Sequence, residues 1–263
     1  MDGLHQPFRN ILSNLRQRTL DLPRGESRNF ARCLLVKTAQ WAFDGKEHLP
    51  TPTAFVGQIS LFFDEMKRGM QDYSLALRAH GNDKRTLSER RWLLQCSAKN
   101  LAVAARDISQ RAALVVTSPP YLGVHVLYNK WQLEGRRELR APFFLVDQHD
   151  IGGAANYTII DRKTKTHTLY YSEIEQSFRA VRTLLKPKAY VIQLVSFGEA
   201  ESALPHYLSA LNRSGLELCE TYMRAGLQWR FVPGRRWYAR VREVENSSAN
   251  REVLLVHRKG GSE

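Results

Sequence analysis

The sequence predicts an α/β protein in which a helical N-terminal region precedes a mostly parallel sheet with an antiparallel C-terminal edge. In the first hundred residues, apolar side chains recur at helical spacing. From about Leu101 onward, short apolar runs alternate with helical stretches, which is typical of strands joined by crossover helices. We therefore expect a helical region over residues 1–98, packed on an α/β domain over residues 99–263.

Three helices are expected in the N-terminal region. The first carries Phe8 and Leu15 on one face, and the second covers the stretch NFARCLLVKTAQWAF. The third follows the loop HLPTPTAF, begins with Thr53 as its N-cap and continues through Met70. None of these helices carries a recognisable chemical motif, so packing against the rest of the molecule is their expected role.

The expected α/β domain contains five strands and two helices. One helix begins at Ser172, which forms a capping box with Glu175, and the other ends at Gly215. Residues 141–171 interrupt the alternation with a polar, glycine-containing tract, which we interpret as a loop insertion. The strands are expected in the stretches NLAVAARD, ALVVTSPPY, AYVIQLVSF, LELCETYM and REVLLVHR.

The chain is strongly basic. Its 39 lysines and arginines exceed its 26 acidic residues, which gives a formal net charge of +13. Such a surplus favours polyanionic partners, with nucleic acid first and an anionic membrane surface second. No apolar run is long enough to span a bilayer, and the start MDGLHQPFRN lacks a signal-peptide core. These features predict a soluble protein of the cytoplasm.

The spacing of cysteines and histidines predicts neither a disulfide framework nor a metal site. Cys33, Cys96 and Cys219 are far apart in the sequence and match no disulfide or zinc pattern. The histidines show no HxxxH or HxE spacing. Among them, His125 follows the motif described next closely enough to line its pocket, although a structural role is the more common one for a lone histidine.

The stretch LVVTSPPY places a rigid corner at the end of an expected strand. Ligands of open α/β sheets bind at the carboxyl ends of the strands. The two prolines have fixed φ and no backbone N–H, so their carbonyl oxygens project as acceptors. With the Ser118 hydroxyl and the flat ring of Tyr121, the corner can hold a planar ring that bears an exocyclic amine. The alternative interpretation is a strand-ending turn without chemistry.

The sequence around this corner resembles motif IV of the amino-methylating DNA methyltransferases. TSPPY after an apolar strand, with serine before the prolines, is similar to the cytosine-N4 enzymes, whereas adenine-N6 relatives more often carry Asp or Asn there. ARCLLVKTAQWA, the acidic AARD and LVVTSPPYLGVHVLYNKWQ occur in a similar order in a bacterial branch of the family. The resemblance covers residues 28–135 well and the remainder by strand order alone.

The resemblance implies a class I methyltransferase-like, Rossmann-like domain and direct methyl transfer from S-adenosylmethionine to the N4 amine of a flipped cytosine. It implies no covalent intermediate and no metal. Double-stranded DNA in the bacterial cytoplasm is the implied substrate, as in restriction–modification systems. It assigns the catalytic socket to Ser118, Pro119, Pro120 and Tyr121, and the cofactor side to Asp107 and Thr117.

One element of the family pattern has no counterpart in the sequence. The family binds the methionine moiety of the cofactor on a Phe-x-Gly-x-Gly loop, and the glycines before Ser118 are all isolated. The chain could therefore be a truncated enzyme, a degenerate paralogue, or half of a split methyltransferase whose second chain supplies that loop. A non-catalytic DNA-binding subunit and an adenine-N6 or RNA methyltransferase are alternative functions.

Two basic segments with aromatic residues are candidate DNA contacts. Residues 222–242 hold six arginines, among them Arg230, Arg235 and Arg236, four further aromatic residues beyond Tyr222, and no acid. Arginines contact phosphates and aromatic rings stack on bases, so this composition suits a nucleic-acid surface. The second segment follows the motif, and its candidate residues are Trp131, Arg136 and Arg137. The alternative is a solvated basic face with core aromatics, including a core tryptophan in an amphipathic helix.

The charge pattern predicts that DNA binding weakens steeply with salt. Each phosphate neutralised by an arginine releases counterions, so the logarithm of the affinity falls with the logarithm of the salt concentration. Fluorescence anisotropy with labelled DNA over a salt series measures this slope. A nearly flat dependence would contradict phosphate contacts by the arginine segment.

Overall fold

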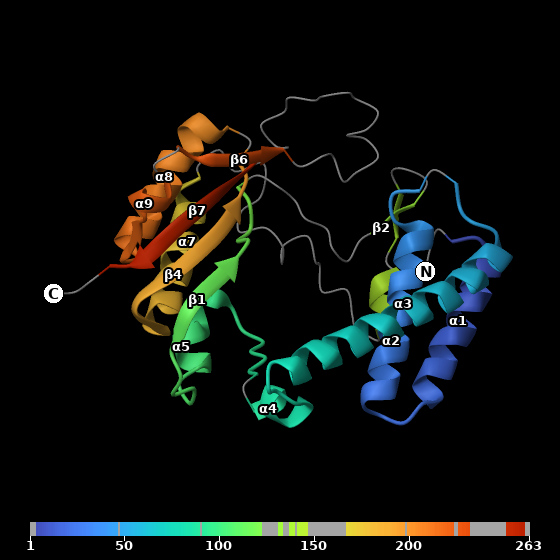
Figure 1. The fold of residues 1–263 in the computed structure, drawn as a ribbon. Coiled ribbons are helices and arrows are strands. Elements are labelled where there is room, and N and C mark those ends of the chain that lie inside the picture. Colours follow the sequence, from blue (N-terminus) through green and yellow to red (C-terminus); the bar gives the residue numbers. More distant parts are fainter. Residues whose placement is uncertain are drawn as a thin grey trace. The chain divides into compact units, whose positions relative to one another are not determined.

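The computed structural model describes residues 4–46, 48–89, 91–122, 131–133, 137–139, 141–146, 167–197, 199–223, 226–231 and 251–260 (Figure 1). The chain divides into two compact units, which are described separately. The first comprises Met1–Trp92, Leu127–Gly153 and Arg236–Tyr238, and the second comprises Leu93–Val126, Ala154–Arg235 and Ala239–Glu263. The first unit thus includes residues after the SPPY corner as well as the N-terminal region.

The first unit is built mainly from helices, together with one antiparallel pair of short strands. Its three long helices confirm the helical expectation for the N-terminal region. The third begins earlier than expected, because the Thr51 hydroxyl rather than Thr53 accepts the N-cap hydrogen bond from the Ala54 N–H, at 3.1 Å. The elements are α1 (Gln6–Asp21), α2 (Glu26–Phe43), α3 (Pro52–Ala79), α4 (Lys84–Glu89), β2 (Trp131–Leu133), β3 (Arg137–Leu139) and α6 (Ala141–Leu145).

Aromatic packing holds the core of the first unit. Phe8 meets Phe43 edge to face, with ring centroids 5.2 Å apart, and Phe43 stacks with Phe55 at 5.9 Å. These three residues come from α1, α2 and α3, so one cluster joins the three helices. Such pairs add to the stability that comes from burying their apolar area. Trp131 and Leu133 of β2 belong to the same buried cluster.

The second unit contains a five-stranded sheet in the order β1-β4-β7-β5, with β6 also paired to β7. The strands are β1 (Ala112–Thr117), β4 (Leu185–Val195), β5 (Leu216–Leu218), β6 (Gln228–Phe231) and β7 (Arg251–Lys259). β1 and β4 are parallel, whereas β7 runs antiparallel to β4, β5 and β6. Among the described strands, the expectation of a mostly parallel sheet is therefore wrong.

The position of β7 also differs from the expected edge. This strand alternates buried and half-buried side chains, with Val253 and Leu255 fully buried. A strand that is apolar on both faces gains most by having neighbours on both sides. β7 accordingly lies inside the sheet, between β4 and β5.

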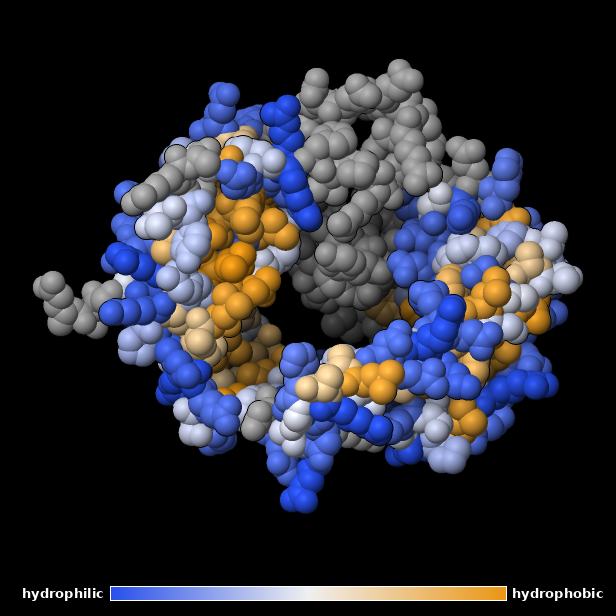
Figure 2. Space-filling model, in the orientation of Figure 1, coloured by the Kyte–Doolittle hydropathy of each residue, from blue (hydrophilic) through white to orange (hydrophobic). Residues whose placement is uncertain are grey.

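Helices cover one face of this sheet. α7 (Thr168–Thr183) and α8 (Ala200–Arg213) lie behind the strands in Figure 1. Their buried residues, including Ile174, Phe178 and Leu211, form one core with the strands. On the other face, Leu114, Val116 and Tyr190 are 53%, 70% and 40% exposed, and an apolar surface is visible there in Figure 2.

Several local expectations for the second unit need correction. The stretch NLAVAARD is helical, forming the 3₁₀ turn η1 (Ala98–Asn100) and α5 (Leu101–Ala104), since short apolar runs suit either structure. The stretch LELCETYM is a strand only over β5 and then turns into α9 (Glu220–Met223). α7 begins at Thr168, so Ser172 is not its cap, and the Ser172 hydroxyl accepts a hydrogen bond from Gln176 instead.

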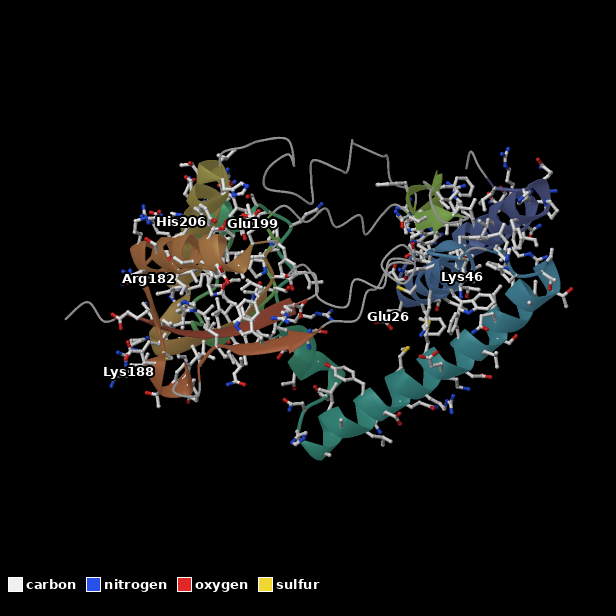
Figure 3. All side chains as sticks on the ribbon, turned by 90° about the horizontal axis from the view of Figure 1, so that it is seen from above. Glu26, Lys46, Arg182, Lys188, Glu199 and His206 are labelled. Atoms are coloured by element: carbon white, nitrogen blue, oxygen red, sulfur yellow. The ribbon has the colours of Figure 1, made fainter. Side chains whose placement is uncertain are left out.

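Gly215 follows α8 in the left-handed conformation, with φ of 80°, as expected for a residue that ends a helix. The Arg182 side chain, which is labelled in Figure 3, lies against it. A Cβ at position 215 would lie 2.5 Å from Arg182 Nε. The backbone conformation therefore favours glycine, and any Cβ here would also displace the Arg182 side chain.

A buried polar chain crosses the helix–sheet interface of the second unit. The Tyr207 hydroxyl donates to Gln193 Oε1 at 2.5 Å, and Gln193 Nε2 lies 3.3 Å from His257 Nδ1. All three side chains are buried. Burial lowers the pKa of His257 to about 4, so the imidazole stays neutral and Nδ1 can accept from the Gln193 amide.

We predict that His257 makes the fold sensitive to acid. A pKa lowered on folding contributes stability that is complete above the unfolded-state value of 6.5 and is lost as the pH falls toward 4. The loss should reach about 3 kcal/mol. Urea unfolding of wild type and His257→Asn between pH 7 and pH 4 measures it, because the Asn amide oxygen can replace Nδ1 without titrating. Equal pH dependence of the two proteins would contradict the prediction.

Candidate functional site

Three strands of the second unit bring their ends together at the SPPY corner. β1 and β4 are parallel, with Thr117 opposite Gln193, so both carboxyl ends lie at one edge of the sheet. β7 runs the other way, and its residue Val253 pairs with Val195 at the end of β4. The start of β7, including Glu252, therefore lies at the same edge as Ser118. This placement agrees with the strand end that the sequence predicted for the motif.

A chain of hydrogen bonds runs through this edge. The Ser118 and Tyr121 hydroxyl oxygens are 2.9 Å apart, and the Tyr121 hydroxyl donates to Glu252 Oε1 at 2.8 Å. Arg230 Nε and Nη2 donate to Glu252 Oε2 at 2.8 and 2.6 Å. The Ser118 hydroxyl also lies 3.2 Å from the Leu194 carbonyl oxygen of β4. Serine and tyrosine of the motif are thus fixed by groups from β4, β6 and β7.

Sequence reasoning missed Glu252. The residue is 131 positions from Tyr121, and no local pattern connects the two. The available signal was an acidic residue at the start of the apolar stretch REVLLVHR, where a charge in a buried strand needs a partner.

The proline corner is anchored to the core of the unit. Pro119 is buried, and the Pro120 carbonyl accepts a hydrogen bond from the Tyr170 hydroxyl of α7 at 2.9 Å. Tyr170 is 1% exposed, and burial raises its pKa, so the phenol keeps its proton and remains a donor. One acceptor position of Pro120 is therefore used within the protein, while the Ser118 side chain is exposed.

The structure separates the residues expected on the cofactor side. Thr117 ends β1 and adjoins Ser118. Asp107 instead precedes the amino end of β1, and its side chain is 90% exposed beside Arg106. The strand that was to present Asp107 is helical, so the structure does not bring this carboxylate to the corner.

The structure places the candidate DNA-contacting residues in different environments. Trp131 is 2% exposed in strand β2 of the first unit, which favours the core alternative, although in a strand rather than a helix. Its contact with DNA stays a prediction. Arg230 lies in β6 and forms an ion pair with Glu252. The side chain of Arg137 in β3 lies outside the described residues, as do Arg136, Arg235 and Arg236.

The described part of the chain offers no group of three or more His, Cys, Asp or Glu side chains that could hold a metal ion. No helix within the same residues has the length and apolar character needed to cross a bilayer. Cys33 and Cys96 are exposed and Cys219 is buried, and all three are free thiols.

Comparison with known proteins gives a partial structural likeness. No family model and no curated protein matches the sequence. A protein of Thermus thermophilus described provisionally as a DNA modification methylase has 15% identity and a TM-score of 0.30, covering 64% of this chain and 53% of that one. Its selenomethionine derivative has 14% identity and a TM-score of 0.29, covering 63% and 51%. The chain thus spans about half the length of these proteins.

We predict that Tyr170→Phe lowers the free energy of unfolding by about 1–2 kcal/mol, because it removes a buried donor from the Pro120 carbonyl. Tyr171→Phe is the matched control. The neighbouring Tyr171 hydroxyl donates to the Ala203 carbonyl at 3.3 Å, in a more exposed position. Urea titrations of both variants compare the two bonds. A Tyr171 variant that loses more stability than the Tyr170 variant would contradict this assignment.

Proposed function

We propose that the chain is the acceptor-binding part of a DNA methyltransferase that modifies the exocyclic N4 amine of a cytosine flipped out of double-stranded DNA. The observation that carries the proposal is the exposed Ser118 hydroxyl, fixed at the carboxyl end of β1 beside Tyr121 and backed by β4 and β7. A turn that only reverses the chain needs no such support. Motif resemblance and a net charge of +13 favour the same substrate.

The chain's own residues would bind and orient the amine. Its two N–H groups donate to the Ser118 hydroxyl and the Pro119 carbonyl, and the Tyr121 ring stacks on the base. Both bonds draw the amine out of conjugation with the ring, which leaves the nitrogen lone pair available for attack. S-adenosylmethionine supplies the electrophilic methyl group in this family.

The described residues do not form a recognisable cradle for the methyl donor. Asp107 precedes the amino end of β1, whereas the corner follows its carboxyl end, and Asp107 is highly exposed. The sequence has no Phe-x-Gly-x-Gly loop. We therefore propose that a separate chain, or a further segment, supplies the donor side. The same observation favours the second candidate function, a DNA-binding subunit without catalysis of its own.

The experiment combines donor binding with transfer. Calorimetry with S-adenosylmethionine tests whether the isolated chain binds the donor, and absence of heat would favour the non-catalytic subunit. Transfer of labelled methyl groups to duplex DNA, followed by nucleoside mass spectrometry, distinguishes N4-methylcytosine from N6-methyladenine. Methylated adenine or RNA as the main product would contradict the proposed target.

Ser118→Ala should reduce transfer on the order of 100-fold, as removal of one positioned polar group does in other active sites. Affinity for DNA should change little, because phosphate contacts dominate it. Ser202→Ala is the control, since this exposed serine bonds to Glu199 at the start of α8. Unchanged transfer by the Ser118 variant would refute the amine-holding role.

A further inference from the structure

Glu252 occupies an unusual position for a carboxylate. It lies in a sheet strand and is only 9% exposed. Burial of a charge is costly unless the group is paired and hydrogen-bonded. Arg230 supplies the opposite charge through Oε2, which directs Oε1 toward the Tyr121 hydroxyl. Oε2 of Glu252 thus contacts a counterion, and Oε1 contacts the motif.

The bond from Tyr121 to Glu252 sets the direction of the other hydrogen bonds at the corner. An ionised carboxylate can only accept, so Tyr121 gives its single hydroxyl proton to Glu252. In the 2.9 Å contact between the two hydroxyls, Tyr121 then has no proton left to give, so a hydrogen bond there uses the Ser118 proton. The other neighbour of Ser118, the Leu194 carbonyl at 3.2 Å, also accepts. Ser118 therefore donates toward the protein and directs its lone pairs away from it.

We infer that Glu252 is a positioning residue that makes Ser118 a hydrogen-bond acceptor for the substrate and thereby selects bases with an exocyclic amine. This inference rests on the proposed function. An amine donates and matches the lone pairs of Ser118. A carbonyl at the same place, as in uracil, accepts and leaves two acceptors facing each other, which disfavours its binding.

Replacing Glu252 by Gln keeps the size of the side chain but reverses the donor and acceptor roles of Tyr121 and Ser118. Arg230 claims the single amide oxygen, so the amide N–H₂ faces Tyr121. Tyr121 then accepts from Gln and turns its own proton toward Ser118, which occupies a Ser118 lone pair. The substrate amine meets a poorer acceptor, and selection against a carbonyl weakens.

The test uses two fluorescent single-stranded oligonucleotides of equal length, one of deoxycytidines and one of deoxyuridines. Single strands avoid the cost of extracting a base from a duplex, and the shared backbone contacts cancel in the ratio of affinities. We expect wild type to bind the cytidine strand more tightly than the uridine strand. In the Glu252→Gln variant, the ratio of the two affinities should fall about tenfold, which corresponds to roughly 1.4 kcal/mol. Fluorescence anisotropy measures both affinities.

Glu217→Gln is the matched control. Glu217 is also a sheet carboxylate paired with an arginine, Arg258 at 3.2 Å, but it belongs to β5 and its side chain is 45% exposed. This variant should keep the preference. In a Tyr121→Phe background, Glu252→Gln should cause no further change, because the connecting hydroxyl is gone. If the Glu252 variant does not fold, Tyr121→Phe alone should still reduce the preference about threefold, since Leu194 then holds the Ser118 proton alone.

The outcomes separate this inference from the proposed function. A Glu252→Gln protein with the wild-type preference, or a wild type without any preference, would overturn the role of Glu252. Methyl transfer by the wild type tests the function independently. Preference that depends on Glu252 without any transfer would support the inference and contradict catalysis by this chain.

Discussion

The pairing of β7 with β4 is the constraint on which the candidate site depends. Six consecutive residue pairs, from Tyr190 with Arg258 to Val195 with Val253, fix these strands in register. That register places Glu252 directly beyond the end of β4, at the edge where β1 delivers Ser118. Because side chains alternate in a strand, a slip by one residue would turn Glu252 to the opposite face. The hydroxyl–carboxylate chain is thus a consequence of sheet register.

The corner combines rigidity from three independent sources. The prolines fix the backbone, Tyr170 holds the Pro120 carbonyl from the helical side, and Glu252 holds Tyr121 from the sheet. Preorganised polar groups lose little free energy when they meet a substrate, because they need no reorientation. The same arrangement explains why Arg230, in a segment that suggested phosphate contacts, is paired with a protein carboxylate instead.

The sequence predicted local structure better than long-range pairing. The long helices were recognisable because their apolar residues follow the helical period over many turns, as at Phe8 and Leu12. The direction of β7 was not, since strand pairing depends on residues far apart in the chain. The run LAVAA was too short to distinguish helix from strand. At the candidate site, proline and hydroxyl chemistry pointed to Ser118–Tyr121 as candidate residues, whereas the contact of Glu252 with them required the three-dimensional arrangement.

The central place of β7 has a consequence for how the protein folds. Residues 251–259 are synthesised after β1, β4, β5 and β6, yet β7 pairs with three of these strands. Until it emerges, β4 and β5 have an unpaired edge facing the gap that β7 will fill, and apolar strand surfaces remain exposed. Contacts between distant residues form slowly, and such intermediates are prone to aggregate. The second unit should therefore complete its sheet late in synthesis, with the SPPY corner among the last parts to take shape.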